Sequence, residues 1–440
     1  MKKDDIIELD ITETNALGNG VGKIDGFVVF CLGAVGGDRV RCRVLTVKKN
    51  YATAEILEIL TASPDRTEPD CASYPECGGC TLRHIDYECE KKAKRASVEA
   101  ALRRAGIRGV NVSETVSCSP ERYRNKAVFS FGDGLLPGFK RAADEQVVSC
   151  EDCLICPGIF TECARFTGEF IKSKYPGKTP EYLYLRINSS YDEMTAVLGL
   201  GELTCVEAGD WAEAFSEAFP VCVGIMASDG THPEDKNTVY RILYGREYIN
   251  ESFLSLKLRV SAHSFFQVNS RAAQLLCKKA ALLAAPGDGE FGVDLYCGTG
   301  VIGMAVASEN PSCFVTGVEI NANAVKDAKM NAEANRLSNI GFYCKDSAEF
   351  AKSTYGQVDF ATIDPPRSGC SDRMIKELLR LSPKRLVYVS CDPQTLARDA
   401  AVLVSAGYTV ESAEPYDLFA RTKHVETLML LTKKLDDTYR

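Results

Sequence analysis

One stretch, FGVDLYCGTGVIGMAV at residues 291–306, constrains the fold more than any other part of the sequence. It passes from a short apolar run, through a glycine-rich turn, into a run with helical apolar periodicity. From about residue 259 the chain repeats this alternation of strand and helix, which is typical of a doubly wound parallel α/β sheet. Ligands of such sheets bind at the edge formed by the carboxyl ends of the strands. Residues that directly follow each predicted strand are therefore the candidates for function.

Several predicted strands end in chemically useful residues. The strand CFVTGVEI carries Glu319 at its end, where a carboxylate can bind ribose hydroxyls. Asp364 opens the turn DPPR, and VYVSCDP places Cys391 at the end of another strand. With 19 cysteines in the chain, any one of them taken alone is expected to be an inert, buried thiol. The convergence of these residues on one sheet edge makes Cys391 a candidate nucleophile.

The glycine turn is ambiguous by itself. Gly298, Gly300 and Gly303 match G-x-G-x-x-G, a pattern found in nicotinamide dehydrogenases and compatible with S-adenosylmethionine (SAM) methyltransferases. A dehydrogenase leaves the rigid DPPR turn and the SCDP motif unexplained. An oxidoreductase is thus an alternative that depends on the glycine motif alone.

Residues 1–258 predict two further domains. Residues 1–62 have short β-branched and aromatic runs between glycine turns, which favour a five-stranded OB-like barrel, a common platform for nucleic acid. Residues 63–258 mix strand-like and helix-like runs and are interpreted as a central α+β domain; residues 259–440 form the α/β domain. A helical part at about 91–122 is a candidate to pack on the α/β domain.

Composition limits the class of protein. The chain is 45% hydrophobic and 25% charged, and it has neither a signal peptide nor an apolar run of about 20 residues, so we expect a soluble cytoplasmic protein without a membrane partner. The net charge of −8 argues mildly against nucleic acid. However, residues 83–126 hold 11 Lys/Arg and 6 Asp/Glu. This excess indicates either a phosphate-facing surface or a solvated helix face, and charge alone favours the latter.

Six motifs stand in a fixed order along the α/β domain: SFFQVN (264–269), DLYCGTG (294–300), GVEI (317–320), DPPR (364–367), YVSCDPQTLARD (388–399) and HVETLMLL (424–431). With them, the chain resembles the RNA uracil-C5 methyltransferase family, specifically its iron–sulfur branch acting on 23S ribosomal RNA, with tRNA relatives. The amino-terminal region resembles the TRAM barrel of that family. The resemblance implies a SAM-dependent enzyme that makes 5-methyluridine.

Roles for individual residues follow from the resemblance. Cys391 would add to C6 of uracil, and Glu426 of HVET would remove the C5 proton. Without the family, Glu426 reads as an ordinary edge-strand carboxylate. In this fold the last strand runs antiparallel, which brings its first residues to the active edge. Residues implied to contact SAM are Gln267, Tyr296, Glu319, Asp346 and Asp364.

Two positions depart from the family pattern. Asp392 replaces the usual Asn after the nucleophile, a change that could raise the pKa of the thiol or alter contacts to the base. Ala420, in DLFART, replaces a proline, and we expect that loop to be less rigid.

A dense cysteine pattern predicts a metal site. Cys71, Cys77 and Cys80 lie within ten residues, and Cys150, Cys153 or Cys156 can supply a fourth thiolate. Four thiolates suit either a 4Fe–4S cluster or tetrahedral zinc. The spacing differs from the radical-SAM pattern. The resemblance favours Cys153 as the fourth ligand and an iron–sulfur cluster over zinc.

The sequence thus predicts a monomeric methyltransferase of RNA, with 23S rRNA as the first choice of substrate. The same chemistry on tRNA is the closest alternative. An RNA-binding protein that has lost catalysis is a third hypothesis, against which the presence of both Cys391 and Glu426 argues.

Overall fold

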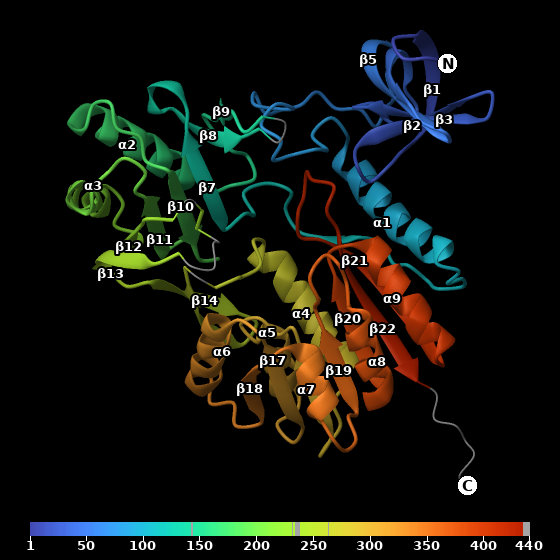
Figure 1. Ribbon diagram of the computed structural model, residues 1–440, viewed down its shortest axis with the longest axis vertical. Coiled ribbons are helices and arrows are strands. Elements are labelled where there is room, and N and C mark those ends of the chain that lie inside the picture. The colour runs from blue at the N-terminus through green and yellow to red at the C-terminus, as the bar shows by residue number, and fades with distance from the viewer. Residues whose placement is uncertain (142–143, 231, 234–237, 263, 434–440) are drawn as a thin grey trace.

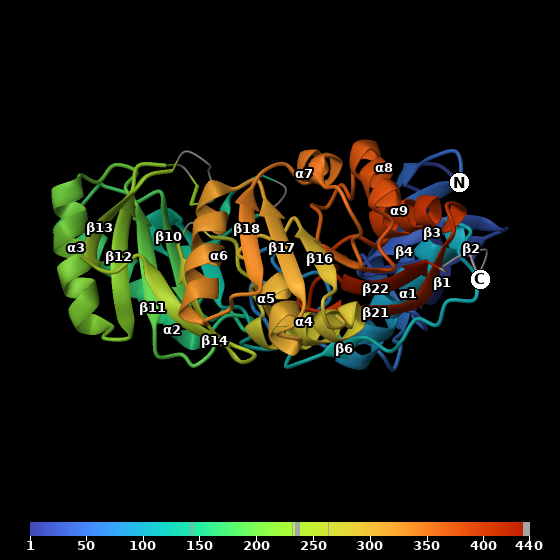
Figure 2. The ribbon, with the colours of Figure 1, turned by 90° about the horizontal axis from the view of Figure 1, so that it is seen from below.

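The structure is a computed structural model that describes residues 1–141, 144–230, 232–233, 238–262 and 264–433. A small barrel at the amino terminus and a central sheet lie at opposite ends of the molecule, and the carboxyl-terminal sheet lies between and below them (Figures 1 and 2). Within the described residues, none of the helices combines the length and apolar character that crossing a membrane requires.

The amino-terminal strands close into a barrel in the order β1-β2-β3-β5-β4, which confirms the predicted five-stranded barrel. In β4, Val40, Cys42 and Val44 are buried while the arginines that alternate with them are exposed, as a period of two requires. The strands are β1 (Ile6–Thr14), β2 (Asn19–Ile24), β3 (Phe27–Leu32), β4 (Arg39–Val47) and β5 (Tyr51–Thr61).

Helix α1 (Tyr87–Arg104) follows a coil of residues 62–86 and begins at Asp86, whose side chain accepts hydrogen bonds from the amides of residues 88 and 89. The helix packs on the carboxyl-terminal part of the chain, against α9 (Pro393–Ser405) and β21 (Tyr408–Asp417). The interpretation of this region as a solvated helix face is wrong for its first half. Glu90 and Lys94 are fully buried there, because residues more than 300 positions away cover them.

The central sheet has the strand order β13-β12-β11-β10-β7-β8-β9. Helices α2 and α3 pack on one of its faces and share a core with it that includes Phe129, Phe160 and Trp211. The elements are β7 (Lys126–Phe131), the 3-10 helix η1 (Asp133–Leu135), β8 (Pro137–Lys140), β9 (Val147–Ser149), α2 (Gly158–Lys174), β10 (Tyr182–Ile187), β11 (Met194–Gly199), α3 (Cys205–Ala218), β12 (Cys222–Ser228) and β13 (Tyr240–Gly245).

A hairpin of β14 (Tyr248–Phe253) and β15 (Leu256–Ser261) leads into the carboxyl-terminal part. Its alternate apolar residues, among them Ile249, Leu258 and Val260, join the core of the carboxyl-terminal sheet and α4 (Ser270–Ala284). The expected domain boundary at residue 258 therefore falls inside β15. The division of the chain into three domains at residues 62 and 258 stays a prediction.

The carboxyl-terminal sheet has eight strands in the order β18-β17-β16-β19-β20-β22-β21-β6. The first five are parallel, which confirms the predicted α/β sheet. The remaining elements are β6 (Val116–Ser117), α4 (Ser270–Ala284), β16 (Phe291–Leu295), α5 (Val301–Glu309), β17 (Phe314–Glu319), α6 (Ala322–Ala334), β18 (Ile340–Cys344), α7 (Ser347–Ser353), β19 (Phe360–Ile363), α8 (Asp372–Leu381), β20 (Arg385–Ser390) and β22 (Glu426–Lys433).

Strand β22 lies between β20 and β21 and is antiparallel to both. Ser390, the last residue of β20, is paired with Thr427, the second residue of β22. The amino-terminal end of β22 therefore lies at the carboxyl edge of the parallel strands, as expected for this fold.

Candidate active site

The carboxyl edge of the large sheet brings the predicted residues together. Tyr296 directly follows β16, Asp364 follows β19 and Cys391 follows β20, while Glu319 is the last residue of β17. Glu426 reaches the same edge because β22 runs in the opposite direction. Strands far apart in the sequence thus place five of the candidate side chains on one edge.

The glycine turn after β16 is built for close approach of backbone. Gly300 has a left-handed φ of 76°, and a Cβ there would collide with the ring of Phe342. Gly298 has a φ of 54°, and a Cβ there would meet no heavy atom of the described residues within 4 Å. The turn therefore faces open space at Gly298, where a ligand can lie against the backbone.

Glu319 is tied to this turn through its carboxylate. One oxygen accepts a hydrogen bond from the amide of Gly298 at 3.1 Å, and the other accepts one from the amide of Asn321 at 2.8 Å. Both bonds fix the carboxylate at the sheet edge. The residue is half-buried, so a ligand on the glycine turn can reach it.

A second carboxyl group lies beneath the turn. Asp294 is buried in β16 and accepts hydrogen bonds from the Thr362 hydroxyl at 2.6 Å and the Gly303 amide at 2.9 Å. Burial raises the pKa of Asp294 to about 6, and the charge of Glu319 adds to the shift. Asp294 supports the turn from inside and is not exposed to a ligand.

Cys391, Glu426 and Asp364 act on one another electrostatically. Burial raises the pKa of the Cys391 thiol to about 11, and the carboxylates of Glu426 and Asp364 add to this, while Arg367 opposes it. Burial likewise raises the pKa of Glu426 to about 8, with Asp364 adding and Arg367 opposing. Burial and Asp294 raise the pKa of Asp364 to about 7. A thiol and two carboxyls, each with a raised pKa, therefore form the centre of the site.

The other two predicted cofactor residues, Asp346 and Gln267, each lie just before a helix. Asp346 caps α7, accepting a hydrogen bond from the Glu349 amide at 2.9 Å. Its charge contributes to the raised pKa of Tyr296, of which burial is the main cause. Gln267 lies in the coil before α4, and its carbonyl accepts a hydrogen bond from the Asn125 side chain of the central region at 2.9 Å.

The two departures from the family pattern have structural roles. Asp392 is the N-cap of α9, where its carboxylate accepts hydrogen bonds from the amides of Gln394 and Thr395 at 2.7 and 3.3 Å. Ala420 is buried, and its carbonyl accepts a hydrogen bond from the Tyr123 hydroxyl at 3.0 Å. The loop that lacks the proline is thus held by contacts to other parts of the chain.

Sequence reasoning missed two residues at the site. Arg367, the last residue of DPPR, is near enough to lower the pKa of both Cys391 and Glu426. His424 lies two residues before Glu426; burial lowers its pKa to about 4, helped by the positive charges of Arg367 and Lys423. Both residues belong to motifs named in the sequence analysis, DPPR and HVETLMLL. The sequence therefore contained them, but no role was predicted for either.

The predicted metal ligands gather in one neighbourhood. The thiols of Cys150 and Cys156 lie close enough to Cys153 to lower the pKa of its thiol. The thiols of Cys77 and Cys80 are both close enough for the charge of Cys153 to raise their pKa, beyond the larger effect of burial. Nevertheless, in the part of the chain that the structure describes, no group of three or more His, Cys, Asp or Glu side chains is arranged to hold a metal ion. The thiols lie together, but their arrangement is not that of a metal centre.

Two family models and several curated proteins match this chain. Residues 235–434 match the tRNA (uracil-5-)-methyltransferase family model, and residues 4–57 match the TRAM domain model. An uncharacterized RNA methyltransferase of Halalkalibacterium halodurans is 33% identical over 99% of this chain and 98% of its own length. One of Listeria monocytogenes is 32% identical over 98% of both chains.

A solved structure is similar over nearly the whole molecule. It is the tRNA (uracil-54, C5)-methyltransferase of Pyrococcus abyssi in complex with S-adenosyl-L-homocysteine. The two structures superpose with a TM-score of 0.75 and 25% sequence identity, over 97% of this chain and 100% of the other.

Proposed function

Because the chain belongs to the RNA uracil-C5 methyltransferase family and carries an amino-terminal TRAM domain, we propose that it methylates C5 of a uridine in RNA, with SAM as the methyl donor. The observation that carries the proposal is the meeting of Cys391, Glu426 and Asp364 at the carboxyl edge of a doubly wound sheet. That edge also holds a glycine turn open to a ligand.

The turn fits a nucleoside cofactor. The open backbone at Gly298 can lie against it, and the fixed carboxylate of Glu319 can accept hydrogen bonds from ribose hydroxyls. Tyr296 and Asp346 flank this position, with Gln267 and Asp364 as further contacts implied by the family. When bound, SAM supplies an electrophilic methyl group.

Cys391 and Glu426 divide the chemistry between them. The Cys391 thiolate forms a bond to C6 of uracil, which gives C5 the nucleophilic character to take the methyl group while S-adenosylhomocysteine leaves. The Glu426 carboxylate then removes the proton from C5. The electrons of that C–H bond restore the C5–C6 double bond, the C6–S bond breaks, and the thiolate is regenerated. A pKa of about 8 suits a base that acts near neutral pH.

The decisive experiment uses Glu426→Gln, because an amide keeps the shape of the side chain but cannot accept the proton. This variant should methylate once and stall as a protein–RNA adduct, labelled from methyl-tritiated SAM on a denaturing gel. The adduct should vanish in the Cys391→Ala, Glu426→Gln double variant. Glu411→Gln on β21 and Cys344→Ala, both exposed, are the matched controls and should turn over normally. Normal turnover by Glu426→Gln, or slow turnover without an adduct, removes Glu426 from the mechanism.

For the substrate, a uridine of 23S rRNA is our first proposal, since the order of TRAM barrel and cysteine motif resembles the 23S-specific branch. The similarity to a solved tRNA (uracil-54, C5)-methyltransferase favours tRNA as the second candidate. Mass mapping of 5-methyluridine in both RNAs, from cells with and without the gene, distinguishes the two. Loss of the nucleotide from tRNA alone would overturn the first choice.

We further infer that Cys71, Cys77, Cys80 and Cys153 hold a 4Fe–4S cluster. Support comes from the donor set and from the closeness of the thiols, although these are not arranged as a metal centre. Anaerobically purified protein should be brown, with about four iron and four sulfide per chain. Replacing Cys153 by Ser should remove iron, whereas Cys344→Ser, an exposed thiol elsewhere, should not. Colourless protein with one zinc, or full iron in Cys153→Ser, would contradict this assignment.

A further inference from the structure

A buried ionic network joins α1 to the loop that precedes Glu426. The loop of residues 418–425 connects β21 to β22 and ends at Glu426, the first residue of β22, whose backbone is paired with Tyr416 of β21. Lys94, Glu90 and Asp417 meet beneath this loop, and the side chains of all three are completely inaccessible to solvent.

Lys94 is the centre of the network. Its ammonium donates hydrogen bonds to Glu90 at 2.7 Å, to Asp417 at 2.7 Å and to the carbonyl of Phe419 at 3.2 Å. An ammonium group has three donors, so all of them are used. Two of the three acceptors belong to the end of β21 and to the loop, which are thereby bound to the helix.

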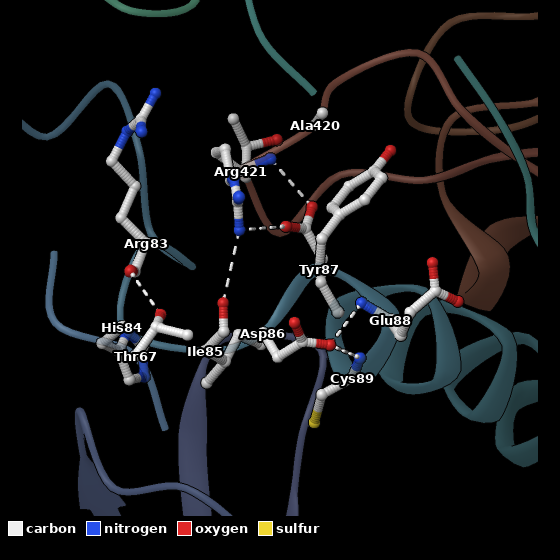
Figure 3. A network of polar contacts seen from close by, with 12 residues as sticks. Thr67, Arg83, His84, Ile85, Asp86, Tyr87, Glu88, Cys89, Ala420 and Arg421 are labelled. Carbon is white, nitrogen blue, oxygen red and sulfur yellow. Dashed lines mark hydrogen bonds and ion pairs between the residues drawn. The ribbon is translucent and has the colours of Figure 1, made fainter. Parts of the chain in front are cut away.

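The other members of the network hold the loop from further sides. Glu90 accepts a hydrogen bond from the backbone amide of Arg421 at 2.8 Å, and Tyr87 donates one to Asp417 at 2.8 Å. The guanidinium of Arg421 lies over the ring of Tyr87, 5.2 Å from its centre, and donates to the carbonyl of Ile85 at 3.3 Å (Figure 3). The Arg421 guanidinium also lies 3.9 Å from the Glu90 carboxylate, so two carboxyl groups and two cations lie together.

The loop needs this restraint because its backbone is strained. Arg421 has a φ of 65°, in the left-handed region that non-glycine residues adopt at a cost. Its carbonyl is also held, by the amides of Thr81 and Leu82 at 2.8 and 3.1 Å. The conformation of the loop is thus imposed from outside by α1 and by the segment that follows Cys80.

Attachment of α1 to the large sheet does not require these charges. Val98, Ala101 and Leu102, further along the helix, are buried in the apolar core formed with the sheet and α9. Buried ion pairs are often no more stabilising than apolar side chains of the same volume. Apolar groups can slide past one another, whereas a set of directional bonds to one ammonium defines a single position of the loop.

We propose that Lys94, with Glu90 and Asp417, is a positioning residue of the methyltransferase: it fixes the β21–β22 loop so that the Glu426 carboxyl stays beside the nucleotide bonded to Cys391. The inference rests on the proposed function. It assigns to α1 an effect on proton removal, the last chemical step, and none on methyl transfer.

The test replaces the network by neutral side chains of similar volume in the variant Glu90→Gln, Lys94→Met, Asp417→Asn. The rate of methyl transfer in a single turnover should stay within about twofold of the parent rate, while the rate of release of methylated RNA should fall about tenfold. The tritium-labelled adduct with Cys391 should therefore accumulate transiently. The matched control is Arg95→Met, Glu99→Gln, which removes a half-exposed (i, i+4) ion pair from the same helix and should change neither step.

Other outcomes decide against the inference. A uniform loss of both steps without adduct means that the network only stabilises the fold. If the triple variant does not fold, Tyr87→Phe, which removes one hydroxyl bond to Asp417, should still slow release about two- to threefold; an unchanged release rate overturns the proposal. If the parent does not methylate RNA, or Glu426→Gln forms no adduct, the proposed function itself has failed.

Discussion

Replacing Glu426 by Gln should stabilise the protein at alkaline pH. The carboxyl is 4% exposed, and burial with the neighbouring Asp364 raises its pKa to about 8 from an ordinary value of 4.5. The folded state therefore binds this proton more tightly than the unfolded state. Unfolding releases the proton between these two values, so stability falls as the pH rises from 4.5 through 8. Glutamine does not titrate in this range, so the variant does not lose stability as the pH rises.

The magnitude follows from the shift in pKa. A difference of about 3.5 units corresponds to about 5 kcal/mol once the pH is above 8, as an upper limit. Since Asp364 shares part of the shift and water relaxes the buried charge, we expect the variant to gain about 2–3 kcal/mol more at pH 9 than at pH 5.

Urea unfolding of the catalytic region, followed at both pH values, measures this gain. The comparison is between the parent, Glu426→Gln and the exposed control Glu411→Gln, which should differ little from the parent at either pH. An equal gain at pH 5 and pH 9 would refute the reasoning, because the benefit would then not come from a buried charge. A loss of stability at pH 9 would show that the ionised carboxylate has a stabilising partner.

Three further predictions concern single residues. In Glu426→Gln the pKa of the Cys391 thiol should fall, because one charge that raises it is gone. Iodoacetamide should therefore alkylate Cys391 about 3- to 10-fold faster at pH 8.5, measured by peptide mass. An equal rate in the parent and the variant would show that the Glu426 charge does not act on the Cys391 thiol. Asp392→Ala should cost about 1 kcal/mol in urea unfolding through loss of the α9 cap, while Asp392→Asn should cost little; equal losses would contradict a capping role. Gly300→Ala should lower the free energy of unfolding by about 1–3 kcal/mol, because φ is left-handed and the buried Phe342 ring occupies the space of the new Cβ. Gly341→Ala, with open space at its Cβ, should leave the free energy of unfolding nearly unchanged in the same assay.

The large sheet could be predicted because its signals are local. Apolar strands of four to six residues, each followed by a turn and a helix, define both the elements and the edge at which their ends meet. For that reason Cys391 and Glu319 could be assigned to one edge without a structure. The antiparallel strand β22, which brings Glu426 to that edge, was accessible only through the family resemblance.

Other features depend on contacts that no local pattern records. Strand β6 has two residues and joins the sheet only because it pairs with the end of β21, which lies 300 positions away in the sequence. Glu90 and Lys94 have the (i, i+4) spacing of a surface ion pair, and charge alone favoured a solvated helix face for this region. They are buried because Asp417 and Phe419 complete their hydrogen bonds, and nothing in the helix sequence itself indicates those partners.

The distribution of charge at the site has a consequence for how RNA enters it. Glu426, Asp364 and the Cys391 thiol are all acids, and each has its pKa raised by burial. A site with these acidic groups favours a neutral uracil ring and disfavours a phosphate. Cations such as Arg367 lie around His424, where their charge helps to lower its pKa, and phosphates bind to such groups. Under the proposed function, the target nucleotide therefore enters base first with its backbone on the cations, which is the geometry of a flipped or looped-out uridine.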